Sequence, residues 1–341
     1  MSPTVAGRAA ALPPDLPKAE LHCHLEGTIP PSLAAEIATR NGIELPADLF
    51  REVGTYAWDD FAGFLRAYDG ASLCLRSARD YRDITYGYLA RCAAEGALYV
   101  ELFSSPDHAA ECGISYAGHV EGIAAAIEDA ERDFGIVGRA IVTCVRHLGP
   151  QRAMAVADAF VHEPHPYFVG FGMGGDEGHL SFADFAPAFA RIADAGYPST
   201  VHAGEHFGPG TVLDALDRLP VTRIGHGVRL IEDPAAVAEV ARRGVVLEIC
   251  PGSNIALGLY PDHAGHPFLQ LRDAGCRVTL NSDDPPFFHT TLGGEYADAA
   301  RGFGLSAGEL LDVTRTALEA AFIDDALRTR LLRRLDAWSA G

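Results

Sequence analysis

The chain has 341 residues, 48% of them hydrophobic, and its 46 acidic and 27 basic residues give a formal net charge of −19. This charge would repel a nucleic acid or an anionic membrane, so neither is expected as a main partner. No apolar run reaches the length of about 18 residues that a membrane-spanning helix needs, and the first residues lack the apolar core of a signal peptide. The seven cysteines are scattered and include no CxxC pair, which argues against a disulfide framework or a cysteine–zinc cluster. A cytoplasmic location is therefore predicted.

Short β-like segments alternate with longer helical segments along the chain. The predicted strands are 19–25, 97–103, 138–145, 167–173, 199–204, 222–228, 245–250 and 277–282. The segments 182–196 and 233–244 have an amphipathic helical pattern, and the second begins at a candidate N-cap, Asp233, and ends at Gly244. Because such alternation is typical of a parallel sheet, eight repeats predict a closed (β/α)₈ barrel, the TIM barrel, within the α/β class.

Three segments lie outside this regular alternation. The stretch from 26 to 96 is too long for one connection, so extra helices are expected between strands 1 and 2, where they could form a lid over the barrel mouth. The segment 305–322 and the tail to Gly341 also have a helical pattern. Residues 1–16 are expected to form a loose N-terminal tail. Without a linker or repeat, residues 1–341 are interpreted as a single domain.

Polar residues gather where the predicted strands end. Strand 1 ends in His22 and His24, strand 5 leads from His202 to Glu205, and strand 6 contains His226. Strand 4 runs into Gly174, Gly175, Asp176 and Glu177, and strand 8 into Asp283 and Asp284. In a TIM barrel the loops at the carboxyl ends of the strands form the active site. Five strands that deliver such residues to one rim therefore predict an active site there.

Four of these residues form a candidate metal site. His22 and His24 are two positions apart, so in a strand both side chains point to the same face. Together with His202 and Asp283 they offer three imidazole nitrogens and one carboxylate, a set suited to zinc and other first-row divalent metals. Such an ion can leave a position for water, whose pKa falls from about 15.7 toward about 7. Any one of these histidines alone would more often be structural, and the combination is what favours a metal.

The remaining polar residues are candidates for the chemistry beside the metal. Glu205 could serve as a general acid and base, although a glutamate in the first turn of a helix is also favourable for stability. His226 could orient the attacking water or accept its proton, with a structural role as the alternative. Asp284 could bond a ring nitrogen of a substrate, although an aspartate before proline is often a turn residue.

Six stretches, in this order, resemble the adenosine deaminase family of purine deaminases: HCHLEG, GFGMGGDE, HAGE, RIGHGV, CPGSN and NSDDPPFFHTTLGGEY. The resemblance implies a barrel, one zinc ion per chain and hydrolytic removal of the 6-amino group of an adenine ring as ammonia. It implies that the zinc ligands are His22, His24, His202 and Asp283. It also implies that Glu205 protonates ring N1, that His226 holds the water, that the backbone N–H of Gly175 meets N3, and that Asp284 bonds N7.

Glu26 departs from the family pattern. The adenosine enzymes carry aspartate at this place, and that aspartate contacts the ribose, whereas glutamate followed by Gly-Thr also resembles the bacterial adenine deaminase branch. The stretches GMGGDEG and DDPPFFHTTLGGEY instead resemble the adenosine side. The main expectation is therefore deamination of adenosine or 2′-deoxyadenosine to inosine or 2′-deoxyinosine, with adenine or aminodeoxyfutalosine as the alternative substrate. A plain loop acid is the remaining interpretation of Glu26.

Other classes fit the sequence less well. A binuclear metal hydrolase would want a bridging lysine from the middle strands, and none is present there. The PCxxC signature of cytidine-type zinc deaminases is absent. A catalytically silent barrel that only binds a ligand would not need Glu205. A homo-oligomer is compatible with the sequence, which says nothing further about assembly.

Overall fold

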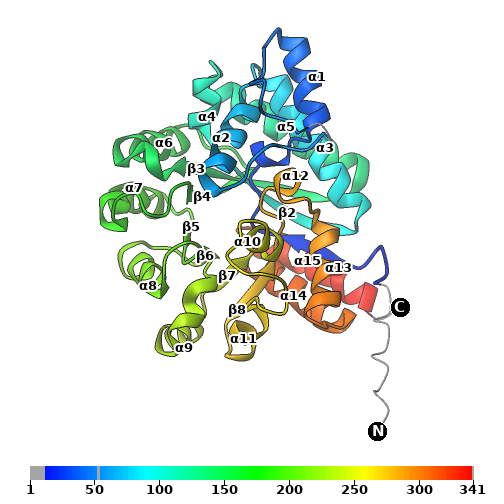
Figure 1. Cartoon of the computed structure of the whole chain (residues 1–341), viewed down its shortest axis with the longest axis vertical. Coiled ribbons are helices and arrows are strands. Elements are labelled where there is room, and N and C mark those ends of the chain that lie inside the picture. The colour runs from blue at the N-terminus through cyan, green and yellow to red at the C-terminus, as the bar shows by residue number, and fades with distance from the viewer. Residues whose placement is uncertain (1–11, 52–53, 340–341) are drawn as a thin grey trace.

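The computed structural model describes residues 12–51 and 54–339. Its eight strands form two parallel sheets, with the order β1-β2-β3-β4 in one and β5-β6-β7-β8 in the other (Figure 1). The strands are β1 (Lys18–Glu20), β2 (Ala97–Ser104), β3 (Val137–Val145), β4 (Phe168–Gly174), β5 (Thr200–Ala203), β6 (Arg223–His226), β7 (Val246–Ile249) and β8 (Arg277–Leu280). All eight predicted strands are present.

The two sheets join at both seams. Between β4 and β5, Phe171 pairs with Ser199, and the Phe171 N–H donates to the Pro198 carbonyl oxygen at 3.1 Å. At the other seam, the His24 N–H donates to the Asp283 carbonyl oxygen at 2.9 Å, and the Asp283 N–H donates to that of His22 at 3.2 Å. The strands therefore close into the predicted (β/α)₈ barrel.

The first strand is shorter than the predicted segment 19–25. Its regular pairing with β2 ends at Glu20, and the Leu21 N–H donates to the side chain of Asn281 at 2.9 Å instead of to a backbone carbonyl. His22 and His24 therefore lie just beyond the strand, on a segment held by isolated bridges to β2 and to the end of β8. The prediction was wrong about the length of the strand. His22 and His24 nevertheless still direct their side chains to one common site.

The extra helices predicted between strands 1 and 2 are α1 (Pro31–Asn41), α2 (Phe61–Ser72) and α3 (Ala78–Ala94). Helix α2 starts where the Asp60 carboxylate accepts a hydrogen bond from the Gly63 N–H. The side chains of Phe64 and Tyr68 on this helix line the cavity at the carboxyl end of the barrel. Helix α2 therefore lies where a lid was expected.

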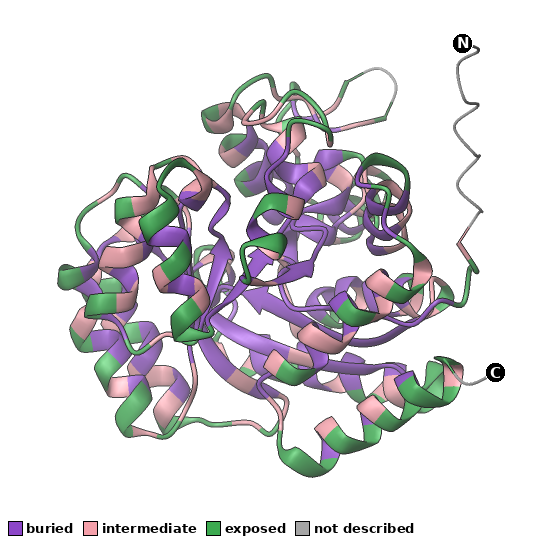
Figure 2. Ribbon diagram, turned by 90° about the horizontal axis from the view of Figure 1, so that it is seen from below, coloured by how far each residue is buried: buried purple, intermediate pink, exposed green. Residues whose placement is uncertain are grey.

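The other helices surround the barrel. They are α4 (Pro106–Glu111), α5 (Tyr116–Phe134), α6 (Pro150–His162), α7 (Phe182–Asp194), α8 (Pro209–Arg218), α9 (Pro234–Arg243), α10 (Pro251–Ala256), α11 (Phe268–Asp273), α12 (Pro285–Phe288), α13 (Leu292–Gly302), α14 (Ala307–Ala320) and α15 (Asp325–Ser339). The Asp233 side chain caps α9 as predicted, and Gly244 ends it in a left-handed conformation. The strands and the inner faces of the helices are buried, and the outer faces are exposed (Figure 2).

The core extends to the first described residues. Residues 1–11 of the expected loose tail lie outside the described residues. Leu16, however, is completely buried, and the Lys18 ammonium donates to its carbonyl oxygen at 2.8 Å. The predicted tail therefore ends earlier than residue 16. Within 12–51 and 54–339, no helix combines the length and the apolar character needed to cross a membrane.

Candidate active site

A cavity of about 80 Å³ lies at the carboxyl ends of the strands. Its lining includes every predicted site residue except His22: His24, Glu26, Gly175, His202, Glu205, His226, Asp283 and Asp284. His22 lies directly behind this wall and is completely buried. The fold thus brings together all nine residues that the sequence singled out.

A larger hollow of about 850 Å³ lies at the opposite end of the strands, with Arg139, Phe168 and Arg277 in its wall. It contains none of the predicted site residues. We place the active site in the smaller cavity because the carboxyl ends of the strands carry the functional loops of a TIM barrel.

The four predicted metal ligands converge on one point. One donor atom from each of His22, His24, His202 and Asp283 lies within 4.8 Å of every other. The Nε2 atoms of His24 and His202 are 3.1 Å apart, and Asp283 Oδ1 lies 3.4 Å from His24 Nε2 and 3.5 Å from His22 Nε2. His22 Nε2 is buried without a hydrogen-bond partner. A buried, unpaired nitrogen in a set of three imidazoles and one carboxylate fits a zinc-like ion.

Outer contacts orient two of these rings. His22 Nδ1 lies 2.9 Å from Glu248 Oε2, and His202 Nδ1 lies 2.9 Å from the Met173 carbonyl oxygen. Because both partners are acceptors, each Nδ1 carries the hydrogen and each Nε2 presents its lone pair to the common point. The sequence analysis did not assign Glu248. Its signal is an acid in the middle of the apolar strand VVLEI.

The electrostatics of the site favour a cation. Burial lowers the pKa of His24 to about 4 and holds the pKa of His202 well below its usual value, so both rings are neutral, as ligands must be. Burial opposes charge on His22 too, but the carboxylates of Asp283 and Glu248 outweigh it and raise the pKa of His22 to about 9, so an ion that binds here must displace the proton from Nε2. Although burial opposes its ionisation, the adjacent imidazoles of His22, His226 and His24 hold the pKa of Asp283 well below its usual value.

Two of the predicted site residues have an unusual backbone conformation. Among the described residues, the non-glycine residues with positive φ are Leu180, His226, Asp283 and His289. His226 and Asp283 both have a φ of 61°. This left-handed conformation costs about 1–3 kcal/mol for a side chain with a Cβ and clusters at functional sites. The strain at His226 and Asp283 therefore indicates that the position of these two side chains is functionally important.

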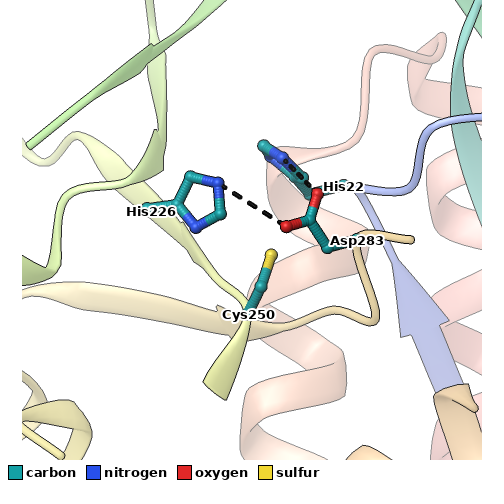
Figure 3. Close-up of side chains that lie close together, drawn as sticks. All are labelled: His22, His226, Cys250 and Asp283. Atoms are coloured by element: carbon teal, nitrogen blue, oxygen red, sulfur yellow. Dashed lines mark ion pairs between the residues drawn. The ribbon is translucent and has the colours of Figure 1, made fainter. Parts of the chain in front are cut away.

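A second group of possible donors overlaps the first. His22, His226, Cys250 and Asp283 also lie within 4.8 Å of one another, and both imidazoles face the Asp283 carboxylate (Figure 3). Burial raises the pKa of the Cys250 thiol well above its usual value, so the sulfur keeps its proton. Since a metal binds the thiolate, the set with His24 and His202 is the better metal site.

Glu205 lies beside the metal cluster and is almost completely buried. Its Oε2 atom is 3.7 Å from His226 Nε2 and 3.6 Å from His206 Nε2. Burial and the neighbouring charges of Asp283 and Glu177 raise the pKa of Glu205 well above its usual value. The protonated carboxyl form that a general acid needs is therefore favoured here.

Glu177 holds the loop that carries Glu205. Its carboxylate accepts hydrogen bonds from the backbone N–H groups of residues 204, 205, 206 and 207 and from the Thr211 hydroxyl, at 2.5–3.2 Å. The sequence analysis quoted Glu177 within GGDE but gave it no role. The structure indicates that this residue positions the Glu205 backbone from the end of the neighbouring strand.

We expect Glu177→Gln to lower kcat by about 10²-fold, because the amide turns an NH₂ group toward backbone donors and the loop loses its register. Metal content should stay unchanged, since no metal ligand lies on this loop. Steady-state kinetics and elemental analysis of the same preparation measure both. Glu121→Gln, an exposed glutamate on α5, is the control with the same change of charge. Unchanged kcat in Glu177→Gln would contradict the positioning role.

Asp284 and Gly27 approach each other closely at the base of the cavity. Asp284 Oδ1 is buried without a hydrogen-bond partner, and a Cβ at position 27 would lie 1.7 Å from it, so only glycine fits there. Burial and the charge of Asp283 raise the pKa of Asp284 well above its usual value. Asp284 thus offers a protonated carboxyl group to the cavity, as a partner for a ring nitrogen. Gly175, with a φ of 99°, lines the same cavity.

Glu26 is buried, so the interpretation as an exposed loop acid was wrong. Its Oε1 atom accepts hydrogen bonds from the hydroxyls of Tyr81 and Ser104 and from the Ser105 N–H, at 2.9–3.3 Å. Its Oε2 atom accepts one from the Tyr68 hydroxyl at 3.2 Å. Each carboxylate oxygen offers about two acceptor positions, so protein donors fully use Oε1, while Oε2 keeps one position open.

Comparison with known proteins shows the family of the chain. Residues 17–338 match the family model described as adenosine deaminase. The chain is 48% identical over 318 residues to an adenine deaminase from Agrobacterium fabrum, which covers 93% of this chain and 97% of the relative. The crystal structure of an adenine deaminase from Arthrobacter aurescens superposes with a TM-score of 0.89 at 31% identity, covering 95% of this chain and 99% of that one.

A solved amidohydrolase with bound Zn, from Burkhoderia ambifaria, superposes with a TM-score of 0.85 at 27% identity over 96% of this chain and 92% of that one. It supports a divalent metal in a barrel of this kind. The family match covers nearly the whole chain, and five of the six stretches that suggested the resemblance contribute residues to one cavity. The chain therefore belongs to the adenosine deaminase family and is a hydrolase of the deaminase type.

Proposed function

We propose that this enzyme is a zinc-dependent adenine deaminase, which converts adenine and water to hypoxanthine and ammonia. The relatives named adenine deaminase favour this alternative over adenosine, the main expectation from the sequence. The stretches GMGGDEG and DDPPFFHTTLGGEY, which resemble the adenosine side, weigh less than this similarity over more than nine-tenths of the chain. The observation that carries the proposal is the environment of Glu26.

By the family resemblance, Glu26 stands at the sequence position whose aspartate contacts the ribose in the adenosine enzymes. Four protein donors already bond its carboxylate, three on Oε1 and one on Oε2. A ribose hydroxyl that displaced one of these donors would leave a buried polar group unpaired. This arrangement favours a free base over a nucleoside or a larger substrate.

The side chains around the cavity supply the steps of the reaction. The protonated Glu205 donates its proton to ring N1, which makes C6 more electrophilic toward water. The Asp284 carboxyl group and the Gly175 N–H hold the ring by N7 and N3 and thereby orient C6. His226 faces the attacking water. We propose one zinc ion per chain, held by His22, His24, His202 and Asp283, which would act as a Lewis acid and lower the pKa of that water.

An ammonia-release assay on metal-loaded protein tests the proposal. Adenine, adenosine, 2′-deoxyadenosine and aminodeoxyfutalosine are compared at equal enzyme concentration. We expect kcat/KM for adenine to exceed that for each nucleoside by about 10²-fold or more, since a ribose has to compete with the protein donors to Glu26. Equal or faster turnover of any of the three nucleosides would overturn adenine as the substrate.

A further inference from the structure

A chain of buried hydrogen bonds lies behind His226 and ends at a backbone amide. The Phe268 N–H, at the start of α11, donates to His266 Nδ1 at 3.2 Å. His266 Nε2 lies 3.2 Å from Asn254 Oδ1, and Asn254 Nδ2 lies 3.3 Å from His226 Nδ1. His226, Asn254 and His266 are all at most 3% exposed. Solvent therefore does not compete for these bonds.

The Phe268 backbone N–H determines which atom donates and which accepts in each of these hydrogen bonds. A backbone N–H only donates, so His266 Nδ1 must accept. Burial lowers the pKa of His266 to about 3, so the ring is neutral and its one hydrogen is on Nε2. That hydrogen points to Asn254 Oδ1, which accepts it and leaves the amide NH₂ group to donate to His226 Nδ1. Since Nδ1 of His226 accepts, the hydrogen of that ring must be on Nε2.

The Nε2 atom of His226 faces the reaction site. It lies 3.7 Å from Glu205 Oε2 and 3.9 Å from Asp283 Oδ2. These distances are too long for direct hydrogen bonds but suit a donor that reaches an oxygen atom between the groups. Asn254 and His266 can therefore affect the reaction only through the His226 ring that they orient.

We propose that Asn254 and His266 are positioning residues that hold His226 in the tautomer with hydrogen on Nε2, so that His226 donates a hydrogen bond to the attacking water and does not accept its proton. The inference rests on the proposed deamination, and it decides between the two roles that the sequence left open for His226. The proton that the water loses passes to Asp283, or to Glu205 after Glu205 has given its own proton to ring N1, and from there to the nitrogen that leaves as ammonia.

The tautomer can be measured without a substrate. In ¹⁵N-labelled, zinc-loaded protein, two-bond ¹⁵N–¹H correlations distinguish a ring protonated on Nε2 from one protonated on Nδ1. The signals of His226 are identified by their loss in His226→Gln. We expect hydrogen on Nε2 and an unprotonated Nδ1. A wild-type ring with hydrogen on Nδ1, alone or together with Nε2, would overturn the proposal.

Three variants, one at Asn254 and a pair at His266, test the relay through catalysis. Asn254→Asp keeps the size of the side chain but replaces the donor to His226 by an acceptor. We expect the hydrogen of His226 to move to Nδ1 and kcat to fall by about 10²-fold or more, with metal content unchanged. His266→Gln keeps a donor near the position of Nε2 and should retain most of the activity, whereas His266→Leu removes it and should not.

An Asn254→Asp protein that shows the reversed tautomer and full kcat would overturn the proposal. The His266 pair keeps the test sharp if Asn254→Asp does not fold, because equal kcat in His266→Gln and His266→Leu would also contradict the relay. Failure of the proposed function is distinguishable from failure of the relay. Hydrogen on Nε2 in a protein that prefers nucleosides would support the relay and reject adenine as the substrate.

Discussion

Glu205→Gln should lower kcat by about 10²- to 10⁴-fold while the protein folds and binds metal normally. Glutamine has the shape of glutamate and can still donate a hydrogen bond to ring N1, but it cannot transfer a proton. The loss therefore isolates proton transfer from substrate positioning. The carboxyl group is buried, and that burial and the nearby Asp283 and Glu177 raise its pKa. Solvent therefore cannot supply the proton that Glu205 would have donated.

The kinetic pattern distinguishes this role from a structural one. We expect KM for adenine to change little and kcat to carry the loss, because the interaction matters chiefly in the transition state. The metal content and the midpoint of thermal unfolding should match those of the wild type. Glu121→Gln is again the control for loss of one negative charge. A Glu205→Gln enzyme with wild-type kcat would exclude Glu205 as the general acid.

The second large effect is expected for Asp283→Asn. This change removes the negative charge of the cluster but suits the left-handed backbone of position 283, because asparagine tolerates positive φ better than most residues. The backbone of Asp283, which closes the barrel seam with His22 and His24, is unaltered. We expect zinc content to fall well below one equivalent per chain and kcat to fall by about 10²-fold or more, since a Lewis acid supplies several kcal/mol.

Elemental analysis after dialysis against a weak chelator measures the zinc content, and circular dichroism checks the fold. The neighbouring Asp284→Asn is the matched control for metal binding, because Asp284 lines the cavity but is not part of the cluster. It should keep its zinc and raise KM for adenine. If Asp283→Asn retained one tightly bound zinc and full activity, the assigned ligand set would be wrong.

Local sequence determined much of this protein. The alternation of apolar segments predicted all eight strands, and the caps predicted helices such as α9, because both depend on side-chain periodicity and neighbouring residues. The spacing of His22 and His24 placed two imidazoles on one face for the same reason. Since parallel strands bring their carboxyl ends to one rim, the order of strands and polar residues was enough to predict which residues would meet.

Only the tertiary structure decided what depends on distant partners. The first strand ends early because Leu21 bonds the side chain of Asn281, 260 residues further on. Glu248 and Asn254 have roles because they contact His22 and His226, which are 226 and 28 residues away. The donors to Glu26 lie 42 to 79 residues further along the chain, and no local pattern shows that four of them bond its carboxylate. Deamination of an adenine ring could thus be predicted from motifs, whereas the proposed preference for a base over a nucleoside rests on contacts that exist only in the folded chain.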